Sequence, residues 1–317
     1  MAGLDDFTMT FSPAMQIWLV ATLFAMMLAV ALNLTPASFR FFRTAPRLYV
    51  AGLVSQLLAL PLVTLALCHL LQPPPTVALG MIIVACCPGG ASSNLVTLFA
   101  RGDIALSVAL TATSSVLAAV LTPVSILFWA RGYGPSAGIL ASVDIDVVRF
   151  LIETTVLLLV PISIGMAVNR LTPAWSARWR DRIGLAAGLS LLAFVIYACV
   201  LYLPDFLALG VGILLLTLAH NMAALATGYG IGSLVRAGPA ARRTLTIETG
   251  IQNTGLALVI LLTQFAGPGL QMGGAVAVVG LYGTYHLVSG GLLAWAWRRF
   301  GADPAVWTAS LSPSSLP

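Results

Sequence analysis

Long runs of hydrophobic residues alternate with short polar segments along almost the whole chain. Each run can supply the roughly 20 apolar residues that a helix needs to cross about 30 Å of hydrocarbon, so each predicts a membrane-spanning helix. The runs predict nine spans, approximately Pro13–Leu34, Leu48–Leu71, Val77–Ala100, Ile104–Ala130, Val147–Leu171, Ile183–Leu203, Phe206–Val235, Leu245–Ala266 and Gly274–Trp297. The sequence therefore predicts an all-α polytopic membrane protein.

Two of the runs, the third and the eighth, are interrupted near their middles by helix-breaking and polar residues. The third contains "IIVACCPGGASSNLVTLFA" and the eighth contains "TIETGIQNTGLALVI". Backbone groups that are freed at such a break cannot face lipid, so each break must be buried in protein or line a wet cavity. Both runs are therefore predicted to be discontinuous helices.

The two breaks lie five spans apart, and this odd separation means that their helices run in opposite directions. The placement is typical of an inverted repeat, here spans one to four against spans six to nine, with the fifth span as a connector. Paired broken helices at corresponding positions of two inverted halves indicate a transport site near the bilayer midplane. Residues 13–300 are thus expected to form a single transmembrane transporter domain.

The composition excludes a soluble domain, because 59% of the residues are hydrophobic and only 8% are charged. All fifteen basic residues are arginines, and most follow odd-numbered spans: Arg40, Arg43, Arg47, Arg101, Arg170, Arg178, Arg180, Arg182, Arg236, Arg242, Arg243, Arg298 and Arg299. The opposite side holds only Arg131 and Arg149. The positive-inside rule predicts an inner-membrane protein whose N-terminus is outside and whose C-terminus is cytoplasmic. The net charge of +5 then reflects topology, and it requires no nucleic-acid partner.

The two ends of the chain are interpreted as short tails. Residues 1–12 are expected to be extracytoplasmic, and their acidic start lacks the basic residues of a cleavable signal sequence. Residues 301–317 are expected to form a cytoplasmic tail of low order. Nothing in the sequence implies an oligomer.

Glu248 is one of only two glutamates in the chain, and it belongs to the eighth run. An ionised carboxylate at this depth is costly unless it is paired or bound to a cation, and no arginine is expected deep within a span. Its segment instead supplies neutral oxygens, from Thr246, Thr249, Gln252, Asn253 and Thr254. Such oxygens with one carboxylate suit a small hard cation, sodium or a proton. Alternatively, Glu248 is simply protonated, or it reaches the cytoplasmic edge near the arginines.

The third and fourth runs offer a matching polar set. Ser92, Ser93 and Asn94 follow the Pro-Gly-Gly break, while Ser107 and Thr111 are four residues apart and share one helical face. Serine and threonine in membrane helices often bond only to their own backbone, and that alternative stays open for each residue singly. Gln56 in the second run is equally compatible with a helix–helix hydrogen bond. Two further polar pairs either line a cavity or pack within the protein: His220 with Asn221, and His286 with Tyr282.

Three motifs, "CCPGGASSNLVTLFARGDIALSV", "TLTIETGIQNTGLA" and "HNMAALATGYGIG", resemble the bile acid:sodium symporter family, which includes bacterial homologues of the apical sodium-dependent bile acid transporter. The resemblance covers residues 13–299. It implies a core domain made of spans near 48–130 and 206–297, which holds two crossing broken helices. It also implies a panel domain made of spans near 13–34, 147–171 and 183–203, with substrate taken between the two domains.

The same resemblance implies two bound sodium ions. One site would be formed by Ser93, Asn94, Ser107, Thr111 and Glu248. The other would be formed by Gln56, Glu248, Thr249, Ile251 and Gln252, with Thr249 and Ile251 contributing backbone carbonyls. Substrate-binding candidates are Gly90, Ala91, Asn253, Thr254 and His286. Ala91 stands where several bacterial relatives are expected to have threonine, and Leu287 where asparagine is frequent, so these positions put the substrate in question.

The expected function is sodium-coupled symport of an organic anion, bile-acid-like or a smaller carboxylate, by alternating access across the lipid bilayer. Half-helices that begin after Gly90 and near Asn253 would direct their positive ends toward the anion. A proton-coupled carrier or an oxyanion exporter of the same fold is the alternative. The sequence holds no HExxH pair, GxGD aspartate or nucleophile beside a base, so an enzyme is not expected.

Overall fold

The computed structural model describes residues 12–34, 41–90, 92–142, 146–201, 210–265 and 272–300. Within these residues the secondary structure is helical, apart from one isolated β-bridge. Seven helical segments are long and apolar enough to cross a membrane: α1 (Pro13–Ala31), α3–η2–α4 (Pro46–Leu71), α7 (Ile104–Arg131), α9 (Val147–Leu171), α10 (Pro173–Leu201), α12 (Gly210–Leu234) and α15 (Gly273–Phe300). The prediction of an all-α polytopic membrane protein is confirmed. The two tails (1–11 and 301–317), Arg40 and Ala91 lie outside the described residues.

The third and eighth runs each consist of two short helices separated by an irregular segment. The third run forms α5 (Pro75–Cys86) and α6 (Ser92–Phe99), and the eighth forms α13 (Pro239–Gly250) and α14 (Thr254–Gln264). Proline and paired glycines end α5 because they cannot continue its hydrogen-bond ladder without cost. At the start of α14, the Asn253 side chain accepts a hydrogen bond from the Leu256 amide over 3.0 Å and so caps the helix.

Two helices begin before the approximate spans that the hydrophobic runs predict. The helix of the eighth run begins at Pro239, before Leu245, and that of the sixth begins at Pro173, before Ile183. In both helices a proline occupies the first turn, where its missing N–H costs nothing. Hydropathy alone did not detect these first turns because arginines interrupt them. The short helices α2 (Phe41–Thr44) and α8 (Gly134–Ser142) were not anticipated.

The second run contains a π-helical segment, η2 (Ser55–Ala59), between α3 (Pro46–Val54) and α4 (Leu60–Leu71). Here the amide of Leu60 donates to the carbonyl of Ser55, five residues earlier. Pro61 follows immediately and has no N–H to donate, which favours a local widening of the helix. The widening lies at Gln56, one of the sequence-predicted site residues.

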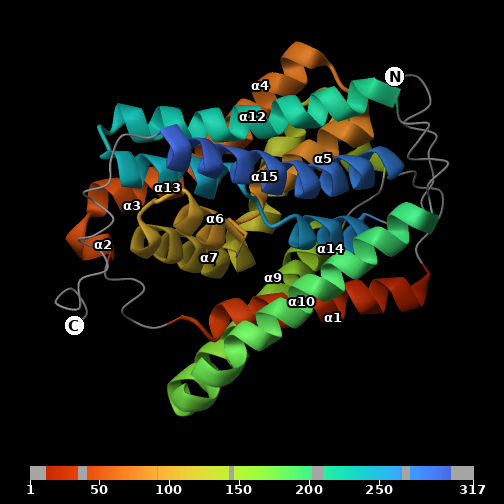
Figure 1. Cartoon of the computed structure of the whole chain (residues 1–317). Coiled ribbons are helices and arrows are strands. Elements are labelled where there is room, and N and C mark those ends of the chain that lie inside the picture. The colour runs from red at the N-terminus through yellow and green to blue at the C-terminus, as the bar shows by residue number, and fades with distance from the viewer. Residues whose placement is uncertain are drawn as a thin grey trace.

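The helices are arranged around a fully buried centre. Nearly every residue of α5 is buried, and α5 packs against α4, α7 and α15. On one side of the molecule α1 packs against α9 and α10, while on the other α12 packs against α13 and α15 (Figure 1). The helices α6, α7 and α14 lie between these two groups (Figure 1). The broken helices are therefore inside the bundle.

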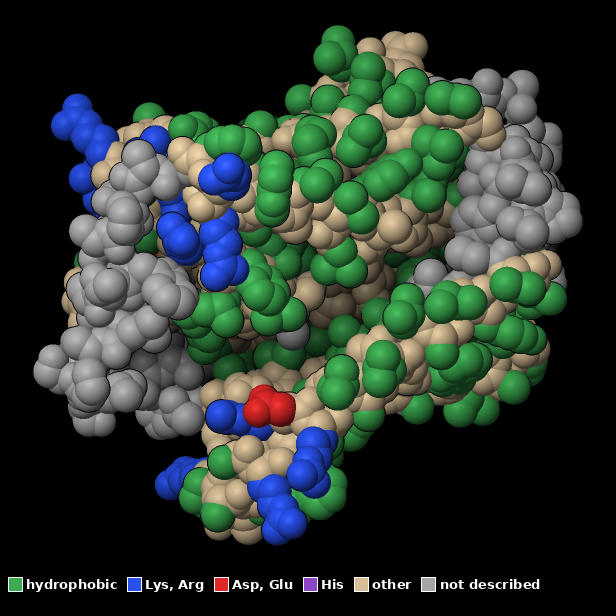
Figure 2. Space-filling view, in the orientation of Figure 1, with side chains coloured by type: hydrophobic (Ala, Val, Ile, Leu, Met, Phe, Trp, Pro, Cys, Tyr) green, Lys and Arg blue, Asp and Glu red, His purple; other side chains and the backbone are tan. Residues whose placement is uncertain are grey.

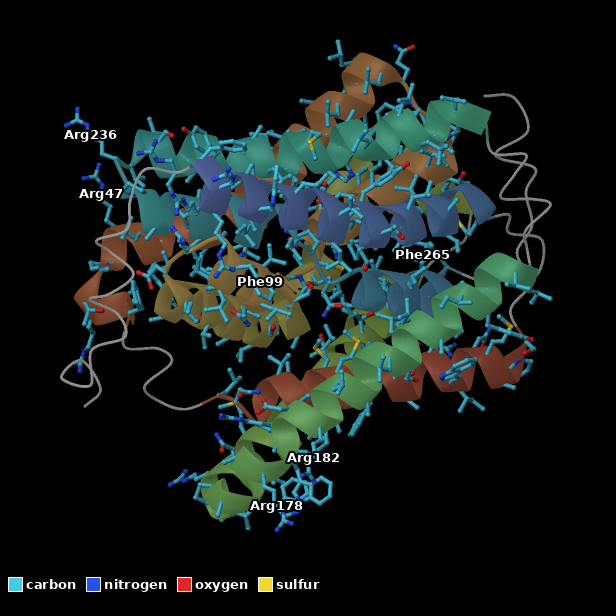
Figure 3. The ribbon with its side chains drawn as sticks, viewed as in Figure 1. Arg47, Phe99, Arg178, Arg182, Arg236 and Phe265 are labelled. Carbon is cyan, nitrogen blue, oxygen red and sulfur yellow. The ribbon has the colours of Figure 1, made fainter. Side chains whose placement is uncertain are left out.

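Arginine side chains gather toward one end of the molecule. Figure 2 shows them at the left end of the upper helices and at the lower end of the diagonal helix, with many hydrophobic side chains over the rest of this face. In Figure 3, Arg47 and Arg236 mark the first group, Arg178 and Arg182 the second, and Phe265 lies toward the other end. This separation is the one that the sequence pattern of arginines predicts.

Candidate functional site

The two helix breaks touch each other through their backbones. Gly89 and Gln252 form an antiparallel bridge. The amide of Gly90 donates to the carbonyl of Ile251 over 3.1 Å, and the amide of Asn253 donates to the carbonyl of Pro88 over 2.9 Å. Each break thus supplies hydrogen-bond partners to the other, as buried irregular backbone requires.

The carbonyl groups at the end of α13 are also satisfied inside the protein. A helix leaves its last carbonyls without intrahelical partners, and here side chains supply them. Gln56 Nε2 donates to the carbonyl of Glu248 over 3.1 Å, and Gln252 Nε2 donates to that of Thr249 over 2.8 Å. The carbonyl of Gly250 accepts from two side chains of α12 and α15. These carbonyls at the break are therefore hydrogen-bonded within the protein.

The Glu248 carboxylate lies at the centre of this region and is fully buried. Ser93 of α6 and Ser107 of α7 donate to Oε1, each over 2.5 Å. Thr111 of α7 donates to Oε2 over 2.9 Å, and Gln56 Nε2 donates to the same oxygen over 3.2 Å. Four polar side chains from three separate segments therefore converge on one carboxylate.

A second layer of oxygens surrounds the hydroxyls. Ser107 Oγ also contacts Asn94 Oδ1 at 2.8 Å and Thr97 Oγ1 at 3.3 Å, and Ser93 Oγ lies 3.3 Å from Thr111 Oγ1. The five residues predicted for the first site are thus brought together. The position of Ser107 follows from its helix start, because the Asp103 side chain caps α7 through the Leu106 amide and fixes its first turn.

The second predicted set also meets at Glu248, where Gln56 Nε2 donates to Oε2 and to the backbone carbonyl. Gln56, Thr249 and Gln252 are buried, and so is Ile251. The side-chain oxygens Oε1 of Gln56 and Gln252 are buried without any hydrogen-bond partner. Unpartnered buried acceptors are uncommon and favour an ion or water as the partner. These oxygens, two backbone carbonyls and a carboxylate suit a hard cation.

The chemistry of the site limits the kind of cation. Within the part of the chain that the structure describes, the salt bridges are Arg149–Glu153 and Arg180–Asp181, and Glu248 belongs to neither. Among these same residues no group of three His, Cys, Asp or Glu side chains comes together. The donor set is therefore one carboxylate with neutral oxygens, which is typical of alkali and alkaline-earth ions and not of transition metals.

A cavity of about 1120 Å³ adjoins the breaks. One wall comes from α1 and α10, with Met26, Gly188 and Leu191 among its residues. The opposite wall comes from α6, α7, α14, α15 and the breaks, and includes Asn94, Thr111, Gln252, Thr284 and Leu287. Figure 2 shows a hollow between the upper helices and the diagonal α10. The cavity is large enough to enclose an organic molecule.

Four of the five predicted substrate-binding residues line this cavity. These are Gly90, Asn253, Thr254 and His286, and the fifth, Ala91, lies outside the described residues. Thr254 is the first residue of α14, so this half-helix begins at the cavity wall. His220, in contrast, is packed between Thr64 and Tyr282 and does not line the cavity.

Several polar residues of this region were not singled out by the sequence. Ser55 bonds to the Thr249 hydroxyl over 2.7 Å, and Thr97 contacts Ser107. Asn221 and Tyr282 bond to Gly250, although they were noted only as cavity or packing residues. An isolated serine or threonine in an apolar helix carries no periodic signal, because most such residues bond to their own backbone. Only the folded arrangement identifies these four.

Comparison with known proteins identifies the family of this chain. A profile described as the Sodium Bile acid symporter family matches residues 20–235. The chain is 29% identical over 298 residues to a probable sodium/metabolite cotransporter of Arabidopsis thaliana chloroplasts, covering 92% of this chain and 69% of the relative. It is 28% identical over 274 residues to the uncharacterized sodium-dependent transporter YocS of Bacillus subtilis, covering 86% of this chain and 80% of the relative. It is 27% identical over 251 residues to the human sodium/bile acid cotransporter 4, covering 77% of this chain and 55% of the relative. The chain therefore belongs to the sodium bile acid symporter family, a family of transporters and not of enzymes.

Proposed function

We propose that this protein is a sodium-coupled symporter that carries an organic anion across the membrane by alternating access. The observation that carries the proposal is the fully buried Glu248 carboxylate, which among the described residues accepts hydrogen bonds from neutral side chains and lies beside a large cavity. A membrane-embedded carboxylate without a cationic side chain is stabilised by a bound cation. The names of the relatives, sodium-dependent transporters and sodium cotransporters, support sodium as that cation.

The proposed number of sodium ions is two, both bound by oxygens that surround Glu248. One would be bound by the carboxylate, the side-chain oxygen of Asn94, and the hydroxyls of Ser93, Ser107 and Thr111. Each hydroxyl can rotate to direct a lone pair at the ion. The other would be bound by Gln56, Glu248, Gln252 and the carbonyls of Thr249 and Ile251. The unpartnered Oε1 atoms of the two glutamines support this second site.

The proposed substrate is a monoanion, either bile-acid-like or a smaller carboxylate. Two sodium ions and one carboxylate leave a charge of +1, which a monoanion would neutralise. The helices α6 and α14 begin at the breaks, and residues at their positive N-terminal ends line the same cavity. The proposed substrate contacts there are Gly90, Asn253, Thr254 and His286. Ala91 remains a proposed contact from its place in the sequence.

The architecture that supports this function has nine crossings. The seven long helices account for seven, and the pairs α5–α6 and α13–α14 would supply the other two as broken helices in an inverted repeat. We propose that α1, α9 and α10 form the panel and that the remaining crossings form the core. The arginine-rich end would be cytoplasmic, in the inner membrane, with the N-terminus outside.

A linkage measurement tests this function. Taurocholate and pyruvate serve as probe anions, and their binding to the purified protein is measured by calorimetry in sodium chloride and in potassium chloride. Coupling predicts that at least one probe binds more tightly in sodium, and that it tightens sodium binding by the same factor. Probe affinity that is equal in both salts would contradict symport. Binding that depends on pH and not on sodium would favour the proton-coupled alternative.

A further inference from the structure

Two polar side chains outside the proposed ligand set donate hydrogen bonds to the backbone at the break of the eighth run. Asn221 of α12 donates to the carbonyl oxygen of Gly250 over 3.0 Å, and Tyr282 of α15 donates to the same oxygen over 3.1 Å. Both side chains are fully buried. Gly250 lies between Thr249 and Ile251, whose carbonyls belong to the proposed second sodium site.

The backbone geometry explains why this contact matters for the neighbouring carbonyls. Gly250 is the last residue of α13, and Ile251 is extended, with φ −106° and ψ 101°. In an extended segment successive peptide groups face opposite sides. The Gly250 carbonyl faces α12 and α15, whereas the Ile251 carbonyl faces the other break and accepts from the Gly90 amide. As long as Ile251 keeps this extended conformation, holding the first carbonyl also orients the second.

The two donors are themselves held in place. Ser289 Oγ donates to Asn221 Oδ1 over 2.5 Å, which leaves Nδ2 facing Gly250. The Tyr282 ring lies between two imidazoles, with centroid distances of 5.1 Å to His220 and 5.7 Å to His286. His286 lines the cavity. The Tyr282 side chain thus joins the cavity wall to the helix break.

We propose that Tyr282 and Asn221 are positioning residues for the second sodium ion. Neither contacts the ion. By holding the Gly250 carbonyl, they direct the carbonyls of Thr249 and Ile251 toward the ion and lower the cost of ordering the break when it binds. This inference rests on the proposed sodium coupling, and it predicts that removing one hydroxyl weakens sodium binding without loosening the fold.

The test compares Tyr282→Phe with Tyr133→Phe in the full-length protein, by sodium titration calorimetry and by thermal unfolding in potassium. Tyr133 is a matched control, because it is also buried and also donates to a backbone carbonyl, that of Pro73 over 3.4 Å, but at the far end of α7. Tyr282→Phe should weaken sodium binding about three- to tenfold and bring the Hill coefficient closer to 1. Its melting temperature in potassium should match that of the control.

Ser289→Ala provides a second variant, in which Asn221 loses the bond that orients its amide. A weaker sodium affinity with an unchanged melting temperature in potassium is again expected. Equal sodium affinity in Tyr282→Phe and Tyr133→Phe would overturn the positioning role while leaving sodium coupling intact. A loss of stability in potassium that equals the loss in sodium would also overturn it, since that result describes a purely structural residue. If the parent protein binds no sodium, the proposed function itself is wrong.

Discussion

Glu248 is the residue on which the proposed chemistry depends. Its oxygens accept four hydrogen bonds from side chains on η2, α6 and α7, so the carboxylate is tolerated inside the bundle without a cationic partner. Three of those donors are hydroxyls, which can rotate and direct a lone pair toward an ion instead. The same side chains can therefore stabilise the carboxylate before an ion binds and help to coordinate the ion afterwards.

Ser107→Ala should weaken sodium binding roughly tenfold, because it removes an oxygen that lies 2.5 Å from the carboxylate. Ser114→Ala is the matched control. Ser114 lies on the same helix and is equally buried, but its hydroxyl bonds only to the Thr111 carbonyl. Sodium affinity measured by calorimetry should drop for the first variant and not for the second. A similar drop in both would mean that α7 packing, and not ligation, is responsible.

At the scale of the element, the broken helices bring ligands from distant parts of the chain within a few ångströms of each other. Close approach at the crossing depends on the absence of side chains. A Cβ atom at Gly89 would lie 3.1 Å from Glu248 Oε2 and 3.4 Å from Gln56 Nε2. Gly89 is therefore needed for space next to the carboxylate, in addition to its part in ending α5.

Gly89→Ala should reduce the sodium-dependent rise in melting temperature, because the added methyl group displaces Glu248 or Gln56 by a few tenths of an ångström. Gly188→Ala is the control, since a Cβ atom there meets nothing within 4 Å. Thermal unfolding of both variants in sodium and in potassium measures the difference. If Gly89→Ala showed the same sodium-dependent rise in melting temperature as the parent, the crossing would accommodate a methyl group without displacing Glu248 or Gln56.

Helix breakers and intramembrane polar residues are local features, and for that reason the sequence predicted the two breaks and Glu248 as a candidate ligand. The residues expected to meet at Glu248 followed from the resemblance to the symporter family. The structure brings together the residues proposed for both sites, although their role as ligands stays a prediction. The π-helical segment at Gln56 was not predictable, because Pro61 is compatible with a kink, a bulge or a helix start. The contacts of Asn221 and Tyr282 with Gly250 were missed because they depend on tertiary packing between α12, α13 and α15.

At the scale of the whole molecule, α9 contacts the C-terminal end of α14 away from the arginine-rich end. Phe150 of α9 packs against Phe265 after α14, with ring centroids 5.7 Å apart, and Glu153 of α9 accepts from Gln264 over 3.4 Å. The cavity instead extends to Arg180 and Asp181 near the start of α10. In the proposed topology this arrangement corresponds to a cavity that reaches the cytoplasmic side.

Arg180→Gln should weaken binding of the anion probe several-fold, because Arg180 is the only cationic side chain among the described residues that line the cavity. Arg178→Gln is the matched control, since Arg178 lies on the same helix end but does not line the cavity. The affinity of whichever probe, taurocholate or pyruvate, binds the parent in sodium is compared across both variants. An equal loss of probe affinity in both variants would indicate that the arginines act through the general surface potential and not through a contact in the cavity.

The central claim, that Glu248 binds sodium, is tested most directly by thermal unfolding of the parent and of Glu248→Gln in sodium and in potassium at equal ionic strength. Glu153→Gln is the control, as Glu153 is the other glutamate in the chain and is partly exposed. At a sodium concentration 100-fold above its Kd, the parent and Glu153→Gln should melt roughly 5 °C higher than in potassium, and Glu248→Gln should show no difference. Equal melting of the parent in both salts, or a full sodium response in Glu248→Gln, would contradict the assignment.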